Sequence, residues 1–184
     1  MAKERIILGI DPGTNIMGYG VIQITNKQPT MICLDVVHLS KLGDHYLKLK
    51  SIFEKTLMII DEFNPDEVAL EAPFFGKNVQ SMLKLGRAQG VAMAAALSRS
   101  IPVFEYLPKK VKMSVTGNGN ASKEQLSGML QSMYNFKDPP KYLDATDGLA
   151  VATTHFLQTK NGHLSQSSKK GWASFLKENP RRLG

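Results

Sequence analysis

Residues 8–14 read LGIDPGT and end the apolar run RIILGID (5–11) with an aspartate and a Pro-Gly turn. An apolar run of this length, rich in Ile and Leu, predicts a central strand of a sheet. A carboxylate at the end of such a strand is costly to bury unless a cation or a set of hydrogen bonds compensates its charge. Asp11 therefore needs a partner from elsewhere in the chain.

The rest of the chain predicts an α/β fold. Strands are predicted at 5–11, 18–25, 30–39, 67–72 and 101–106. Helices are predicted at 46–63, 79–100 and 142–157, with Asp44 capping the first of them, and a further helix starts at the capping box Ser122/Gln125. The first three strands follow one another closely, whereas the later ones alternate with helices. This pattern predicts an antiparallel meander joined to parallel strands in one mixed sheet.

Composition limits the class of protein. The chain has 184 residues and a 42% hydrophobic content, enough for the core of one domain, and a single cysteine, Cys33, which excludes an internal disulfide. It contains no apolar run of the ~18 residues that a membrane helix needs, so we expect a soluble, intracellular protein. The net charge is +7, but six basic residues against one acid lie from Lys160 onward. Nucleic-acid binding by the rest of the chain must therefore depend on local clusters.

Acidic residues occur where three distant segments are expected to meet. Asp11 and Glu71 each end an apolar strand, and Asp144 and Asp147 share a face of the first turn of the last helix. Converging carboxylates repel one another, and Mg²⁺, which prefers oxygen ligands, relieves that repulsion. Taken singly, Asp144 could instead stabilise its helix by interacting with the positive end of the helix dipole, and Glu71 could pair with a lysine. Their conjunction with Asp11 favours a metal site.

Five segments of the chain resemble those of a known family. The resemblance runs from about residue 6 to 158 and is carried by LGIDPGTNIMGYGVI (8–22), ALEAPFFGKN (69–78), LKLGRAQGVAMAA (83–95), PVFEYLPKKVKMSVTGNGNASKEQL (102–126) and LDATDGLAVATTHF (143–156). These motifs are similar to those of the RuvC family of Holliday junction resolvases, bacterial endonucleases of the ribonuclease H-like fold. Thr146 and Gly148 depart from the alanines common there, and glycine within a helix costs up to ~1 kcal/mol relative to alanine.

The resemblance implies a catalytic and metal-binding role for Asp11, Glu71, Asp144 and Asp147. In the family such acids hold two Mg²⁺ ions, with Mn²⁺ as a substitute: one ion activates the attacking water and the other stabilises the leaving oxygen. The implied reaction is symmetric cutting of a four-way junction that leaves 5′-phosphate and 3′-hydroxyl nicks, in recombination and repair. Whether Asp147 is a direct metal ligand stays open.

DNA-binding residues are also indicated. By resemblance, Lys112 and Lys123 lie near the scissile phosphate and Phe74 stacks on a junction base. From the residues themselves, Phe75 or Phe74 either stacks on a base or packs under its loop. The full set expected to contact DNA is Phe74, Phe75, Lys77, Lys109, Lys110, Lys112 and Lys123.

The family acts as a homodimer in the cytoplasm. The small-residue helix at 79–98 is a candidate interface, and a helix buried on the sheet is the alternative. We expect a nuclease domain at 1–159 and a basic tail at 160–184, whose role is open among disorder, DNA binding and docking on a partner such as the RuvA–RuvB complex.

Three other classes of protein share some of these sequence features. The IDPGT motif also occurs in actin-like ATPases and sugar kinases, but these need two such lobes, and 184 residues cannot supply both. The shorter YqgF-type nucleases are disfavoured by the Phe-Phe loop and the Lys112/Lys123 region. A junction-binding protein without catalysis is disfavoured because carboxylates repel phosphates.

Overall fold

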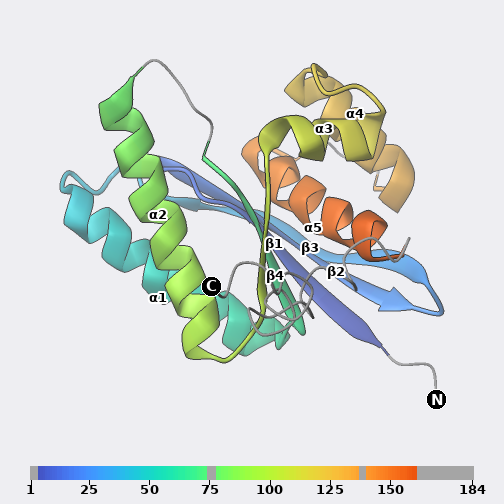
Figure 1. The fold of residues 1–184 in the computed structure, drawn as a ribbon, viewed down its shortest axis with the longest axis horizontal. Coiled ribbons are helices and arrows are strands. Elements are labelled where there is room, and N and C mark those ends of the chain that lie inside the picture. The colour runs from blue at the N-terminus through green and yellow to red at the C-terminus, as the bar shows by residue number, and fades with distance from the viewer. Residues whose placement is uncertain (1–3, 74–77, 137–139, 161–184) are drawn as a thin grey trace, which may run out of the picture.

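The computed structural model describes residues 4–73, 78–136 and 140–160, and these residues build one mixed sheet with helices on both faces (Figure 1). The strands are β1 (Arg5–Asp11), β2 (Ile16–Thr25), β3 (Gln28–His38), β4 (Glu67–Glu71) and β5 (Val103–Tyr106). The helices are α1 (His45–Phe63), α2 (Val79–Ser98), α3 (Pro108–Thr116), α4 (Lys123–Tyr134) and α5 (Asp144–Lys160). None of these helices is both long and apolar enough to cross a membrane.

The sheet has the order β3-β2-β1-β4-β5. β1, β2 and β3 pair antiparallel, whereas β4 pairs parallel to β1 and β5 parallel to β4. The two residues between β2 and β3, Asn26 and Lys27, both adopt positive φ, as a tight hairpin turn with the right-handed twist of its strands requires. The five-stranded sheet with a meander and parallel strands is confirmed.

Side chains that alternate along the strands divide the core into two layers. Leu8 and Ile10 of β1 pack in the cluster that contains α1 and α2, whereas Ile7 packs in the cluster that contains α3, α4 and α5. Asp11 shares the parity of Ile7, and Glu71 shares the parity of Ala69, which also packs on the α5 side. Strand periodicity therefore turns both carboxylates toward the face that α5 covers.

Helix α5 packs directly on the backbone of the sheet. Its residues from Ala145 to Phe156 are all buried. A Cβ added at Gly18 of β2 would lie 1.8 Å from the carbonyl oxygen of Asp144, and one added at Gly148 would lie 2.4 Å from Cα of Tyr19. Both distances are far below van der Waals contact, so glycine is needed at both positions. The glycine that lowers helix propensity in α5 is thus what lets the first turn of α5 approach β2.

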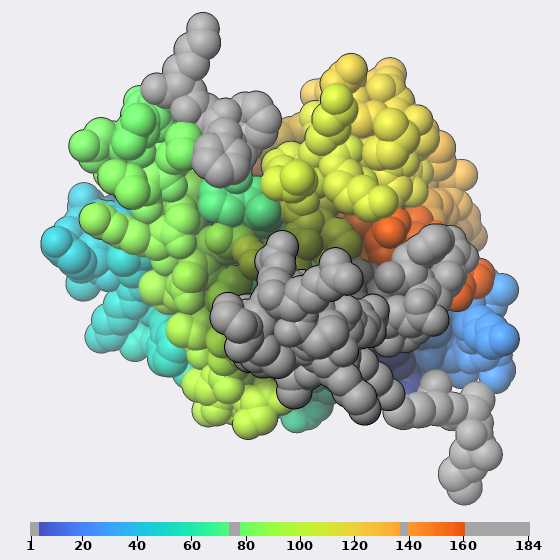
Figure 2. All heavy atoms as spheres, viewed as in Figure 1, coloured from blue at the N-terminus to red at the C-terminus, as the bar shows by residue number. Residues whose placement is uncertain are grey.

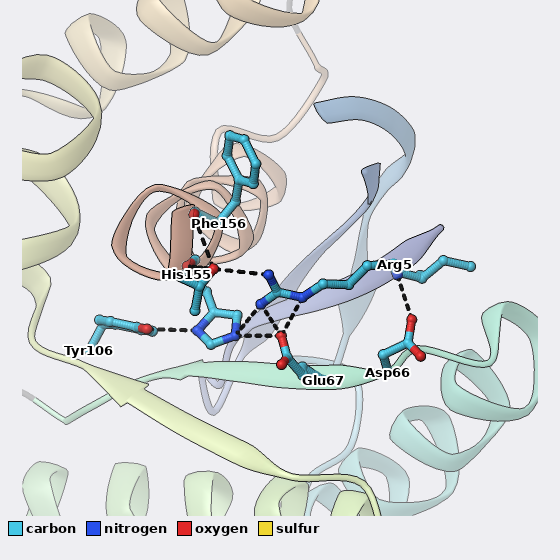
Figure 3. A network of polar contacts seen from close by, with 8 residues as sticks. Arg5, Asp66, Glu67, Tyr106, His155 and Phe156 are labelled. Carbon is cyan, nitrogen blue, oxygen red and sulfur yellow. Dashed lines mark hydrogen bonds and ion pairs between the residues drawn. The ribbon is translucent and has the colours of Figure 1, made fainter. Parts of the chain in front are cut away.

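A polar network holds the other half of α5 (Figure 3). The His155 ring is fully buried; its Nε2 lies 2.8 Å from Oε2 of Glu67, and its Nδ1 lies 2.7 Å from the Tyr106 hydroxyl. Arg5 donates from Nε to the same Glu67 oxygen at 2.8 Å and from Nη1 to the Thr159 hydroxyl at 3.0 Å. Side chains from β1, β4 and β5 are therefore tied to α5, which fixes where α5 lies along the sheet.

The structure departs from the sequence prediction mainly at α3, which was not predicted. Its residues PKKVKMSVT carry few apolar side chains, and only Val111 and Val115 are buried. Pro108 at the first helical position was the local signal for a helix start. Elsewhere the predicted elements are found with ends shifted by a few residues.

Candidate active site

Asp11 and Glu71 lie side by side at the carboxyl ends of β1 and β4. The parallel register pairs Ile10 with Leu70, so the next residue of each strand is one of these acids. Both are partly buried, and both line a cavity of about 120 Å³ together with Pro12, Gln89 and Pro108. Two strands that are adjacent in the sheet therefore bring two carboxylates to one edge.

Asp144 and Asp147 come to the same site from the first turn of α5. Lys123 bridges them: its Nζ donates to Asp144 Oδ1 at 2.9 Å and to Asp147 Oδ2 at 2.5 Å. Lys123 is held there because it is the first residue of α4, where the side chains of Ser122 and Gln125 form the expected capping box. Asp147 is 8% exposed. In the described part of the chain, the Asp144 carboxylate accepts a hydrogen bond from this lysine and from no backbone amide.

The four carboxylates influence one another electrostatically. Burial raises the pKa of Asp11 to about 7, and the negative charges of Asp147 and Asp144 add to the rise. Burial, together with the charges of Asp11 and Asp147, raises the pKa of Glu71 to about 8. The pKa of Asp147 is raised as well, again mainly by burial, although its hydrogen bond to Lys123 opposes the rise. The positive charge near these three carboxylates therefore does not fully compensate their negative charge.

Two lysines supply part of that charge. Burial lowers the pKa of Lys123, but its hydrogen bonds to Asp147 and Asp144 outweigh this effect and raise the pKa above its ordinary value. The positive charge of Lys112 on α3 opposes part of the rise in the pKa of Glu71 and of Asp147. Among the described residues, Glu71 forms no ion pair within 4.0 Å.

The donor set fits an oxygen-preferring divalent cation. Mg²⁺ prefers oxygen ligands such as carboxylates. The four carboxylates lack enough compensating positive charge, although Lys123 places one cationic group between two of them. As the described side chains stand, no three His, Cys, Asp or Glu residues lie close enough to share one metal ion. Binding of one ion by three of these carboxylates would therefore require some of their side chains to move.

Of the remaining residues predicted to contact DNA, the structure describes only some. Lys109 and Lys110 are exposed on α3, and the structure shows no contact between them and the carboxylates. Phe74, Phe75 and Lys77 lie outside the described residues. In Figure 2, α2 (green) and α3 with α4 (yellow) stand on either side of the end of β4.

Sequence reasoning missed one buried residue of the site. Gln89 of α2 is 8% exposed; its Nε2 donates to Glu105 Oε1 at 2.6 Å and to the carbonyl oxygen of Glu71 at 3.4 Å. It thereby fixes the end of β4 that carries Glu71. The signal was a lone amide on the helix face lined by Ala88, Ala92 and Ala96, which face the core.

The fold and this cluster define a class. A five-stranded mixed sheet with carboxylates at the ends of two neighbouring strands and on the helix that covers them is a ribonuclease H-like nuclease. The family model described as "Crossover junction endodeoxyribonuclease RuvC" matches residues 7–155. This chain belongs to the RuvC family of crossover junction endodeoxyribonucleases, which are metal-dependent nucleases.

Individual relatives agree with this assignment. The chain is 60% identical to the "Crossover junction endodeoxyribonuclease RuvC" of Christiangramia forsetii, with 100% of this chain and 95% of the relative covered. It is 59% identical to the protein of the same description from Bacteroides fragilis, over 98% of this chain and 97% of the relative. A solved structure, "T. thermophilus RuvC in complex with Holliday junction substrate", superposes with a TM-score of 0.79 at 29% identity, over 86% of this chain and 97% of that one.

Proposed function

We propose that this chain resolves four-way DNA junctions by symmetric, metal-dependent hydrolysis that leaves 5′-phosphate and 3′-hydroxyl nicks in recombination and repair. The observation that carries the proposal is the meeting of Asp11, Glu71, Asp144 and Asp147 at one edge of the sheet beside Lys123. The relative whose structure was solved with a Holliday junction supports four-way DNA as the substrate.

The four carboxylates would hold two Mg²⁺ ions, with Mn²⁺ as a substitute. Bound there, such ions supply a hydroxide at neutral pH and charge stabilisation for the leaving oxygen. The chain's own residues do the rest. Asp11 and Glu71 are held by adjacent strands, so their separation is set by the sheet, while Lys123 and Lys112 bring positive charge to where a phosphate must approach four acids.

DNA contacts would surround this site. Lys112 and Lys123 approach the carboxylates from α3 and α4 and are assigned to the scissile phosphate. Lys109 and Lys110, exposed on α3, are assigned to the backbone beyond it. Phe74, Phe75 and Lys77 follow Glu71 closely in sequence, and we assign them to unpaired bases and the adjacent backbone of the junction.

Symmetric cutting requires two active sites, so we propose a homodimer. One face of helix α2 packs on the sheet, and the opposite face is our candidate for the dimer interface. Ala88, Ala92, Ala95 and Ala96 are buried, Ala88, Ala92 and Ala96 against the sheet. The opposite face carries a stripe of exposed apolar or small residues spaced by four, seven and seven positions, which places them on one side of a helix. The stripe consists of Val79, Leu83, Gly90 and Leu97.

The remaining assignments are proposals of the same kind. The nuclease domain comprises residues 1–159. The basic tail at 160–184 binds DNA or docks on a branch-migration complex of the RuvA–RuvB kind. The protein acts in the cytoplasm, where bacterial DNA is found.

The test is an assay with an end-labelled synthetic four-way junction and a matched linear duplex, each with Mg²⁺ and with EDTA. Paired nicks in the junction alone, and only with Mg²⁺, are expected. Ligation of the nicked product without further treatment would identify the 5′-phosphate and 3′-hydroxyl ends. Binding without nicking under all metals would refute the proposal and favour a junction-binding protein without catalysis.

A further inference from the structure

A second cavity lies beside the candidate active site and has a different character. It measures about 350 Å³ and is formed where the first turns of α1 and α2 meet the loop that follows β1. Both helices begin at the upper left of Figure 1. The polar residues that line the cavity are Thr14, Asn15, His45, Lys48, Ser81 and Lys84.

The two cavities are neighbours. Leu85 lines both this cavity and the one that contains Asp11 and Glu71. Thr14 lies only three residues beyond Asp11. The second cavity is on the α1 and α2 side of the acids, whereas Lys112 and Lys123 approach the acids from α3 and α4. The carboxylates are therefore flanked by basic groups on two sides.

The lining is suited to an anion. It contains two lysines and no carboxylate. Lys48 donates from Nζ to Asn15 Oδ1 at 2.9 Å, which leaves further donors on its ammonium group. In the described part of the chain, neither Lys48 nor Lys84 forms an ion pair with an acid. The nearest acid in sequence, Asp44, is exposed and accepts a hydrogen bond from the backbone of Tyr46 as the cap of α1.

Further donors point to the same ligand. Thr14 and Ser81 bring hydroxyl groups, and the Nε2 atom of His45 is buried without a hydrogen-bond partner among the described residues. The first turns of two helices add the positive end of their dipoles. Ammonium, hydroxyl and imidazole donors around one cavity form a phosphate-binding arrangement.

We propose that this cavity binds a backbone phosphate of the DNA strand that passes through the active site, on the side opposite Lys112 and Lys123. The inference rests on the proposed nuclease function. Four acids repel the DNA backbone, so a strand needs positive charge both before and after the scissile phosphate to remain in place. The cavity supplies that charge on the side where the lysines of α3 and α4 do not reach.

The test compares two double variants that change the net charge equally. Lys48→Ala/Lys84→Ala removes both lysines of the cavity, and Lys50→Ala/Lys55→Ala removes two exposed lysines of α1 that do not line it. Binding to a labelled four-way junction is measured in EDTA over a range of salt concentrations. The cavity variant is expected to bind on the order of 10-fold more weakly, with a slope of log K against log salt shallower by about 1–2.

Three results decide the matter. Equal slopes for the two double variants would overturn the proposal, as would failure of Lys48→Arg/Lys84→Arg to retain the wild-type slope. Calorimetric titration with inorganic phosphate tests whether the ligand is free phosphate instead of DNA. Tight phosphate binding that depends on Lys48 and Lys84, with an unchanged slope of log K against log salt for the junction, would mean a free-phosphate site and would also overturn the proposal. Absence of junction nicking by the wild-type protein would instead refute the proposed function.

Discussion

Replacing Asp11 by asparagine is expected to slow cutting strongly and at the same time to stabilise the metal-free protein at alkaline pH. The carboxylate has a pKa of about 7 in the folded protein against 3.8 for the free side chain, mainly because it is buried. The folded state therefore holds a proton that the unfolded chain releases. Stability falls as pH rises from about 4 to about 7, and the loss is complete above that window.

The magnitude follows from the shift. About three pKa units correspond to ~4 kcal/mol, and partial exposure to solvent reduces this to about 1–2 kcal/mol. Asparagine has nearly the same shape and carries no charge to bury. Asp11→Asn is therefore expected to raise the melting temperature by roughly 2–8 °C at pH 8 in EDTA, with little difference from wild type at pH 4. Junction nicking should fall by on the order of 10³-fold.

The assay is thermal unfolding in EDTA and in Mg²⁺ at several pH values, together with junction nicking. Mg²⁺ should stabilise the wild type more than the variant, because the variant has lost a ligand. Asp61→Asn is the control: its carboxylate is exposed, and the hydrogen bond from Arg99 lowers its pKa, so this change should not stabilise the protein at pH 8. A metal-free Asp11→Asn protein that melts below wild type at pH 8 would refute the electrostatic reasoning, and retained nicking would refute the catalytic assignment.

Three further substitutions test other parts of the structure. Gly148→Ala should destabilise the protein by about 2 kcal/mol or more because the added Cβ meets the backbone of Tyr19; a melting temperature at or above wild type, as helix propensity alone predicts, would contradict the packing described. Gly90→Arg adds a side chain in open space on α2, so it should leave folding intact but shift the protein to a monomer in analytical ultracentrifugation, whereas Gly128→Arg, equally open on α4, should not; dimers in both would rule out the α2 stripe. Lys123→Gln should lower metal-free stability at pH 8 by about 1 kcal/mol and increase the stabilisation gained from Mg²⁺, both seen by thermal unfolding, and an unchanged response to Mg²⁺ would mean that the lysine does not compete with metal for the carboxylates.

Several features of this protein were predictable because their causes are local in sequence. The strands and most helices follow from apolar periodicity, and α1 and α4 begin at the caps expected, Asp44 and Ser122. Four acids could be assigned to three segment ends because strand ends and first helical turns are identifiable from pattern alone. Helix α3 was missed because its lysine-rich residues give little apolar periodicity.

The arrangement of distant segments relative to one another depended on packing, which no single segment encodes. The sequence indicates that Asp144 and Asp147 share a helical face, but the packing of α5 on the backbone of β2 places that face beside Asp11. The same packing reverses the meaning of Gly148, from a weak point of a helix to a requirement for contact.

The sequence alone thus determined every strand, all helices but α3, and which acids stand at their ends, since these depend on neighbours a few residues away. Only the tertiary structure decided their pKa values, the bridging position of Lys123 and the basic cavity around Lys48, because burial and charge depend on distances between residues far apart in the chain.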